Sequence, residues 1–196
     1  MKKRAVFLDR DGTINRDVGY PDSYNLIELY PESFEAVRKI NQAGLLAVVI
    51  TNQSGVGRGL IKEENLQEIH KRMAREFSYH HSRLDAFYYC PHYIFAADPK
   101  YRADCSCRKP LPGLALRAAR DLNINTAGSY IVGDKVEDIL LGLNIKARPV
   151  LVLTGYGQRS LEVIKKEKLG PVHIAQNLLE AILWILEQEK TRGETI

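Results

Sequence analysis

The sequence lacks a hydrophobic run long enough to span a bilayer. Its longest apolar stretch covers residues 45–50, far short of the roughly 20 residues that a membrane-spanning helix needs. The apolar run after the basic start stops at Asp9, which is too soon for an export signal. We therefore expect no membrane partner and a cytoplasmic location.

Cysteine is scarce, and linkers and repeats are missing. The three cysteines are an odd number, which excludes a fully paired intramolecular set of disulfides and fits a reducing compartment. No internal repeat, low-complexity tract or linker divides the 196 residues, of which 45% are hydrophobic. We expect one domain over residues 1–190 and a flexible tail over residues 191–196.

The charge is only mildly basic. The chain carries 28 Lys and Arg against 24 Asp and Glu, and the two signs are interleaved along the sequence. This pattern favours a small phosphate-bearing substrate over nucleic acid. We expect a monomer.

Short runs rich in branched aliphatic and aromatic residues alternate with segments of helical periodicity. This rhythm predicts an α/β fold: a doubly wound, Rossmann-like and mostly parallel sheet with helices on both faces. The predicted strands cover residues 5–8, 45–50, 86–89, 130–132 and 150–153. Ligands of such sheets bind beyond the carboxyl ends of the strands, so the residues that follow each strand are the candidates for function.

Several of these strand ends are followed by residues suited to phosphate chemistry. The segments are Asp9-Arg10-Asp11-Gly12-Thr13, Thr51-Asn52-Gln53-Ser54-Gly55 and Gly133-Asp134-Lys135, with Asp138 soon after, and Arg108-Lys109-Pro110 lies between the last two. Paired carboxylates can divide nucleophilic and acid–base work, and the other groups offer acids for a metal and cations for a phosphate. The first segment alone could be an ordinary turn, but all four together predict an active site.

In this order the four segments resemble the motifs of the haloacid dehalogenase phosphatases, over nearly the whole chain. The resemblance implies that Asp9 is the nucleophile, that Asp11 is the general acid and then base, and that Thr51 and Lys109 hold the phosphoryl group. It also implies Mg²⁺ bound by the carboxylates of Asp9 and Asp134 and the backbone carbonyl of Asp11. Asp138 either orients Lys109 or stabilises the start of a helix.

All three cysteines and one histidine fall in a single segment, residues 90–107. Cys90, His92, Cys105 and Cys107 together make a complete set of tetrahedral zinc ligands. With four protein ligands no coordination position stays open, so we expect a structural Zn²⁺ that staples a short loop. Because Cys107 directly precedes Arg108, this metal would also fix the cations that face phosphate. The competing interpretation is a set of unliganded thiols.

The spacing of the motifs leaves no room for a large cap domain, so loops should set specificity. Within the superfamily, the motif set resembles the phosphatases of heptose 1,7-bisphosphates, and it shares much with histidinol-phosphate phosphatases. The resemblance implies Mg²⁺-dependent removal of the C7 phosphate of a heptose 1,7-bisphosphate, with histidinol phosphate as the alternative substrate. It assigns substrate binding to Asp17, Val18, Gly19, Tyr20, Asn52, Gln53, Ser54, Arg108 and Lys135. Residues 144–149 depart from an alanine–glycine step that is frequent in the family.

Two other functions are less consistent with the sequence. The glycines near Arg58 resemble a nucleotide-binding loop, but no lysine followed by serine or threonine comes after them. A zinc module that binds nucleic acid would leave the acidic strand ends unexplained. Among the other histidines, we expect His70, His80 and His81 to be solvated and His173 to lie in a late strand.

Overall fold

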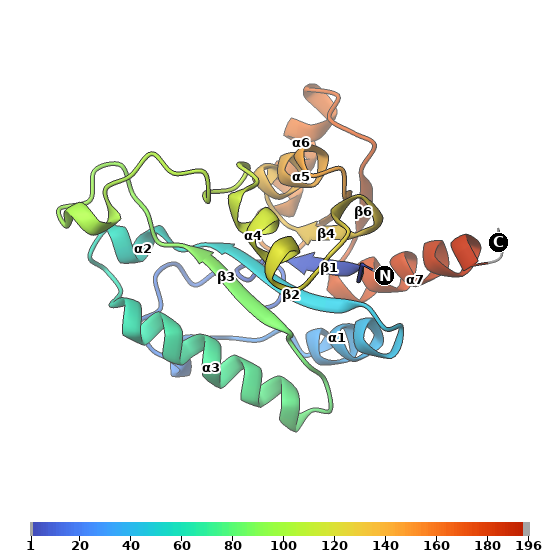
Figure 1. The fold of residues 1–196 in the computed structure, drawn as a ribbon, viewed down its shortest axis with the longest axis horizontal. Coiled ribbons are helices and arrows are strands. Elements are labelled where there is room, and N and C mark those ends of the chain that lie inside the picture. Colours follow the sequence, from blue (N-terminus) through green and yellow to red (C-terminus); the bar gives the residue numbers. More distant parts are fainter. Residues whose placement is uncertain (1, 194–196) are drawn as a thin grey trace.

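The computed structural model describes residues 2–193, and the centre of this part of the chain is a six-stranded parallel sheet (Figure 1). The strands occur in the spatial order β3-β2-β1-β4-β5-β6, and each neighbouring pair runs parallel. Their bounds are β1 (Ala5–Leu8), β2 (Leu46–Asn52), β3 (Ala86–Cys90), β4 (Tyr130–Gly133), β5 (Arg148–Val152) and β6 (His173–Ala175). The predicted doubly wound parallel sheet is therefore confirmed.

The strands differ from the prediction mainly at their ends. β2 continues through Asn52, because Asn52 is still in register with Cys90 of β3. β5 begins at Arg148 rather than at residue 150, and Pro149, which has no N–H to donate, makes this start hard to recognise from sequence. His173 lies in β6, as expected.

In the described part of the chain, three helices cover each face of the sheet. The helices are α1 (Glu32–Gln42), α2 (Ser54–Gly57), α3 (Glu63–Tyr79), α4 (Gly113–Asp121), α5 (Val136–Asn144), α6 (Gly157–Lys166) and α7 (Leu178–Gly193). Side chains of α1, α3 and α7 share one buried cluster with the sheet, and those of α4, α5 and α6 pack on the opposite face. The short α2 belongs to neither layer and follows β2 at the edge of the sheet where the strands end.

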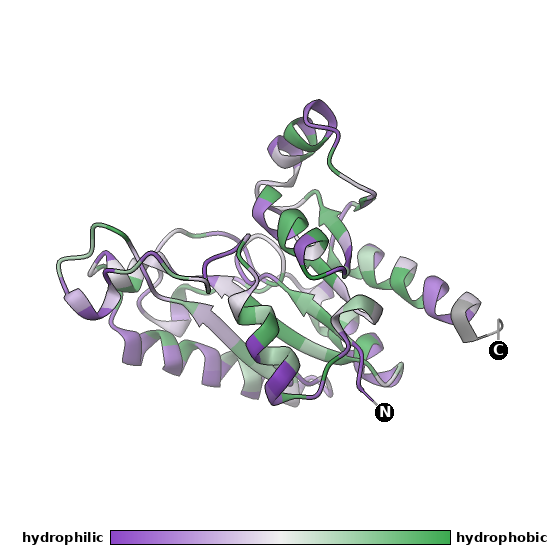
Figure 2. Cartoon of the chain, turned by 45° about the horizontal axis from the view of Figure 1, so that its top comes forward, coloured by the Kyte–Doolittle hydropathy of each residue, from purple (hydrophilic) through white to green (hydrophobic). Residues whose placement is uncertain are grey.

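The alternation of side chains along β1 fills both layers. Val6 and Leu8 pack toward α1, α3 and α7, whereas Ala5 and Phe7 pack toward the other helices. A strand that is buried on both faces has a continuous run of apolar residues, which explains why β1 was recognisable in the sequence. In Figure 2 the central strands are green, the colour of hydrophobic residues, whereas the outer side of α3 is purple, the colour of hydrophilic residues.

The end of the described chain is helical. α7 continues through Gly193, three residues beyond the predicted domain end at residue 190, and the rest of the predicted tail, residues 194–196, lies outside the described residues. Within residues 2–193, no helix combines the length and the apolar character that crossing a bilayer requires.

The order of the strands creates a switch point at β1. The next strand along the chain, β2, lies on one side of β1, and β4 lies on the other side. At such a point the connections leave the sheet in opposite directions and open a crevice beyond the strand ends. The crevice at the ends of β1, β2 and β4 is where the predicted motifs meet.

Candidate active site

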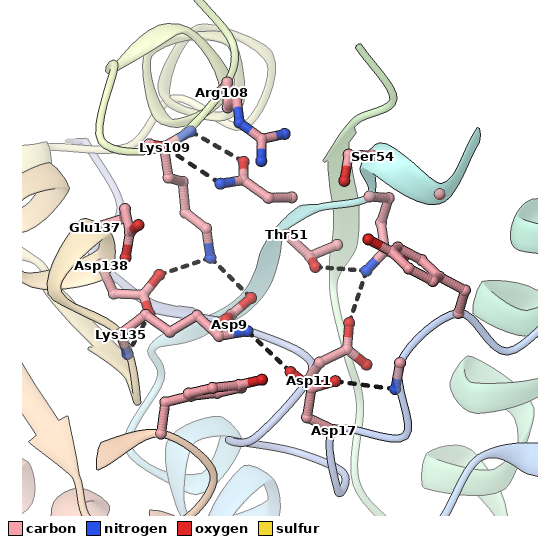
Figure 3. Close-up of a pocket in the computed structure, with 16 residues that line it drawn as sticks. Asp9, Asp11, Asp17, Thr51, Ser54, Arg108, Lys109, Lys135, Glu137 and Asp138 are labelled. Atoms are coloured by element: carbon pink, nitrogen blue, oxygen red, sulfur yellow. Dashed lines mark hydrogen bonds and ion pairs between the residues drawn. The ribbon is translucent and has the colours of Figure 1, made fainter. Parts of the chain in front are cut away.

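A cavity of about 340 Å³ lies at the ends of β1, β2 and β4 (Figure 3). The four residues predicted as catalytic all line it: Asp9, Asp11, Thr51 and Lys109. Most of the predicted substrate-binding residues line it as well: Asp17, Gly19, Tyr20, Asn52, Gln53, Ser54, Arg108 and Lys135. Val18 is 40% exposed and lines a neighbouring cavity instead. Asp134 is completely buried beside Asp9 and does not line the cavity.

The Lys109 side chain reaches between two carboxylates. Its Nζ lies 2.7 Å from Asp9 Oδ1 and 2.6 Å from Asp138 Oδ1 (Figure 3). It also donates a 2.9 Å hydrogen bond to the carbonyl of Ile50. Burial alone would lower the pKa of Lys109, but Asp138 and Asp9 offset this and raise it above its ordinary value. The ammonium is therefore charged, and its three donors have partners.

The backbone of Lys109 is also held. The Asn52 side chain donates to the Lys109 carbonyl at 3.2 Å, and its oxygen accepts from the Lys109 amide at 3.0 Å. Asn52 was predicted to bind substrate. In the structure its amide ties the loop that carries Lys109 to the end of β2.

Asp138 performs both of the roles that the sequence left open. Its Oδ1 pairs with Lys109, and its Oδ2 accepts from the amide of Lys135 at 3.0 Å at the start of α5. Gly133 makes this position possible, because a Cβ at residue 133 would come within 2.2 Å of Asp138 Oδ2. Burial raises the pKa of Asp138 to about 6, although Lys109 acts in the opposite direction.

The Asp11 carboxylate accepts hydrogen bonds from three side chains. Arg10 donates to both oxygens, at 3.0 and 2.8 Å, Asn15 donates to Oδ1 at 2.9 Å, and Gln53 donates to Oδ2 at 2.8 Å. Burial alone would raise the pKa of Asp11, but Arg10 and these hydrogen bonds lower it. The nearby Thr51 hydroxyl accepts from the same Gln53 amide at 2.9 Å.

The prediction for His70 was wrong. We expected a solvated side chain, but His70 is 6% exposed, and its Nε2 lies 3.3 Å from Nη1 of the fully buried Arg10. Burial and the nearby guanidinium lower the pKa of His70 to about 3. His80 and His81 are exposed, as predicted.

The carboxylates beside the cavity fit a hard divalent cation. One oxygen each from Asp9, Asp134 and Asp138 lie within 4.8 Å of one another, and Asp134 Oδ1 is buried without a hydrogen-bond partner among the described residues. Burial, together with Asp9 and Asp138, raises the pKa of Asp134 to about 8. A cation would reverse that shift. Gly12 makes room, since a Cβ there would lie 2.2 Å from Asp134 Oδ2.

The predicted zinc ligands meet in space. The ligand atoms of Cys90, His92, Cys105 and Cys107 all lie within 4.8 Å of one another, and no disulfide joins the thiols. Cys107 Sγ lies 3.0 Å from Cys90 Sγ, 3.2 Å from Cys105 Sγ and 3.1 Å from His92 Nδ1. One nitrogen and three sulfurs that converge in this way fit a tetrahedral Zn²⁺.

Sequence reasoning missed two residues that line the cavity, Glu137 and Tyr156, and it named Gly55 only as part of a segment. Tyr156 donates its amide to Asp134 Oδ2 at 2.8 Å, and its ring centroid lies 5.0 Å from Lys135 Nζ. It follows β5 by four residues, so the rule of inspecting every strand end, applied to β5 as well, would have found it. Glu137 stands between Lys135 and Asp138 in a segment that was already singled out.

The double pairing of Lys109 yields a stability prediction. Asp138→Asn removes one of the two charges that compensate a buried ammonium, so we expect the free energy of unfolding to fall by about 2 kcal/mol. Chemical denaturation measures this change. The control is Glu162→Gln, an exposed residue of α6, which should stay within about 0.5 kcal/mol of the parent. Equal stability of the two variants would show that Asp138 is not needed to hold Lys109.

The comparisons with known proteins agree with this geometry. Residues 106–181 match the family model described as HAD-hydrolase-like. The chain is 42% identical over 154 residues to D-glycero-beta-D-manno-heptose-1,7-bisphosphate 7-phosphatase of Pasteurella multocida, covering 78% of this chain and 83% of that one. It is 40% identical to the enzyme of the same name from Escherichia coli K12, covering 77% and 80%.

A solved structure gives the same result. The D,D-heptose 1,7-bisphosphate phosphatase from B. bronchiseptica, complexed with magnesium and phosphate, superposes with a TM-score of 0.82 at 32% identity, covering 94% of this chain and 99% of that one. The chain thus belongs to the D-glycero-beta-D-manno-heptose-1,7-bisphosphate 7-phosphatase family of haloacid dehalogenase-like hydrolases.

Proposed function

We propose that this chain removes the C7 phosphate of D-glycero-D-manno-heptose 1,7-bisphosphate and releases heptose 1-phosphate and inorganic phosphate. The observation that carries the chemistry is the buried Asp9 carboxylate in the cavity, 2.7 Å from the Lys109 ammonium and beside the fixed carboxyl group of Asp11. The names of the relatives support the substrate. They do not favour the histidinol-phosphate alternative.

The reaction proceeds in two steps. In the first, a carboxylate oxygen of Asp9 attacks phosphorus, the bond from phosphorus to the C7 oxygen breaks, and protonated Asp11 gives its proton to that oxygen. In the second, the Asp11 carboxylate takes a proton from a water that attacks phosphorus, and Asp9 is released. The hydrogen bonds that surround Asp11 lower its pKa, so they favour the carboxylate of the second step and oppose the protonated form that the first step uses.

Lys109 and Thr51 hold the phosphoryl group while it moves. Phosphoryl transfer depends on positioning and on neutralising the charge of the equatorial oxygens more than on strong acid or base. The Lys109 ammonium is charged and fixed, and the Thr51 hydroxyl is held by Gln53. The Thr51 hydroxyl thus keeps its proton free for a phosphoryl oxygen, and Lys109 exchanges one of its three present partners for one.

The catalytic cofactor of this proposal is Mg²⁺. Its protein ligands are the carboxylates of Asp9 and Asp134 and the backbone carbonyl of Asp11, and the unpartnered Oδ1 of Asp134 supports this set. When bound, Mg²⁺ supplies positive charge to the phosphoryl oxygens. The B. bronchiseptica phosphatase, which was solved as a complex with magnesium and phosphate, is consistent with this role.

The second cofactor is a structural Zn²⁺ held by Cys90, His92, Cys105 and Cys107. Its position supports a structural role in holding this loop, because Cys107 is followed directly by Arg108 and Lys109. The loop around it is also joined to α2, since the Gly57 amide donates to the Pro91 carbonyl at 2.9 Å. Fixing this loop would fix the cations that face the substrate.

The rest of the substrate is bound by the remaining cavity residues. Arg108 offers a planar fork for the sugar or its second phosphate. Lys135 pairs with Asp17 at 3.1 Å, which ties the loop containing Asp17, Val18, Gly19 and Tyr20 to the start of α5.

The cytoplasmic location, the monomeric state, the absence of nucleic-acid partners and the domain bounds stay predictions of the sequence.

The substrate assignment is tested by phosphate release in the presence of Mg²⁺. We expect kcat/KM for one anomer of the heptose 1,7-bisphosphate to exceed that for histidinol phosphate by about a hundredfold, because cations that bind a second phosphate stay unpaired with a monophosphate.

Asp9→Asn should abolish turnover, and Asp22→Asn, which changes an exposed carboxylate outside the cavity, should leave it unchanged. A preference for histidinol phosphate would refute the substrate, and full activity of Asp9→Asn would refute the covalent mechanism.

The zinc proposal is tested by metal analysis of protein purified without chelator. We expect about one zinc per chain, and Cys107→Ala should lose it and lower the midpoint of thermal unfolding by about 5 °C or more. Ser106→Ala is the matched control, since this exposed neighbour offers no ligand and should keep the metal. The site would be ruled out if the parent protein contained no zinc and Cys107→Ala unfolded at the same midpoint as the parent.

A further inference from the structure

A buried histidine lies behind the candidate active site without a place in the reaction. His70, on α3, is 6% exposed, and its ring stacks on Phe87 of β3 with centroids 4.8 Å apart and an interplanar angle of 20°. Its Nε2 faces Nη1 of Arg10 at 3.3 Å. Arg10 stands 60 residues earlier in the chain, between Asp9 and Asp11.

The direction of this hydrogen bond is determined by the chemistry of arginine. A guanidinium has only N–H donors, so Nε2 of His70 must accept, and the proton of the neutral ring is on Nδ1. Burial, followed by the charge of Arg10, lowers the pKa of His70 to about 3. His70 is therefore a neutral acceptor at ordinary pH, and it does not itself exchange protons with a substrate.

The other donors of the same guanidinium hold Asp11. Arg10 Nε donates to Oδ1 at 3.0 Å and Nη2 donates to Oδ2 at 2.8 Å, so the carboxylate lies against one edge of the guanidinium plane. The histidine accepts from the remaining nitrogen. Because the guanidinium is planar and fully buried, fixing Nη1 also fixes the plane in which Asp11 is held.

We propose that His70 is a positioning residue for Asp11, acting through Arg10. The inference rests on the proposed function, in which Asp11 gives a proton to the leaving oxygen and later takes one from water. Without the acceptor at residue 70, Nη1 is left unpaired in a buried site and the guanidinium can turn. The carboxyl group of Asp11 then loses its fixed direction toward the reacting oxygen.

The geometry separates this effect from substrate binding. Lys109 and Thr51, which meet the phosphoryl group, are held by hydrogen bonds and an ion pair from other side chains: Asp138, Asn52 and Gln53. Loss of the acceptor should therefore lower kcat and leave KM nearly unchanged. It should also act most strongly on substrates whose leaving oxygen needs a proton.

Two substitutions distinguish the acceptor from simple packing. His70→Met keeps an unbranched side chain of similar length but offers no strong acceptor, whereas His70→Gln carries an amide oxygen that can meet Nη1. His80→Met, at an exposed histidine after α3, is the control. Circular dichroism and thermal unfolding establish that each variant is folded before its rates are compared.

The readout is the rate of phosphoryl transfer to Asp9 in single-turnover experiments with two substrates. For the heptose bisphosphate, a poor leaving group, we expect His70→Met to slow transfer about tenfold and His70→Gln about twofold or less, with KM unchanged. For p-nitrophenyl phosphate, whose leaving group needs no proton, both variants should match the parent. Asn15 and Gln53 still hold Asp11, which is why the loss stays below that of a missing acid.

Three results would overturn the inference: an unchanged rate in His70→Met, equal slowing with both substrates, or no rescue by glutamine. Failure of the proposed function gives a different pattern. In that case the parent protein does not hydrolyse the bisphosphate, or Asp9→Asn remains active, whatever residue 70 is. If the parent prefers histidinol phosphate, this alkyl ester replaces the bisphosphate in the same comparison.

Discussion

The arrangement of the site depends on one buried ammonium between two carboxylates. Lys109 comes from the loop after the cysteine cluster, Asp9 from the end of β1, and Asp138 from the first turn of α5. A buried charge is tolerated only when it is paired and hydrogen-bonded, so these three parts of the chain must meet for any of them to be stable. Asn52 adds a fourth part, because its amide holds both backbone polar groups of Lys109 at the end of β2. The same interaction that satisfies the buried charges leaves a cation beside the Asp9 carboxylate, where a phosphoryl group would be attached.

The second set of interactions surrounds Asp11 and has a different purpose. Arg10, Asn15 and Gln53 fix its carboxylate, and His70 holds Arg10 from behind. Lys109 and Asp11 are thus held by separate networks. The Lys109 network directs a positive charge toward phosphorus, and the Asp11 network directs a proton toward the leaving oxygen. This division is consistent with a reaction in which charge neutralisation and proton transfer make distinct demands. Gln53 links the Asp11 network to the Thr51 hydroxyl, because it donates to both groups.

The sequence predicted those parts of the site that local rules determine. Asp9, Thr51 and Asp134 were found because residues at the ends of parallel strands gather at one edge of the sheet, whatever the rest of the fold does. The cysteine cluster was found because all three cysteines and one histidine fall in a single segment and together form a complete set of zinc ligands. His70 was misjudged because its neighbours Lys71 and Arg72 are charged. Helical spacing from Leu66, four residues earlier, places it on the buried face, which also contains Met73 and Phe77. Its contact with Arg10 spans 60 residues, and no local pattern reveals that pairing.

The most direct test of the account is to look for phosphate on Asp9. Protein that is turning over the heptose 1,7-bisphosphate is quenched in acid, which preserves an acyl phosphate, and is then digested and mapped by mass spectrometry. The account predicts phosphate on the peptide that contains Asp9, in an amount that rises when the attack of water is slowed, as in Asp11→Asn assayed with p-nitrophenyl phosphate. Phosphate release at the parent rate with no phosphorylated peptide, or with the label on another residue, would contradict the central claim that Asp9 is the nucleophile.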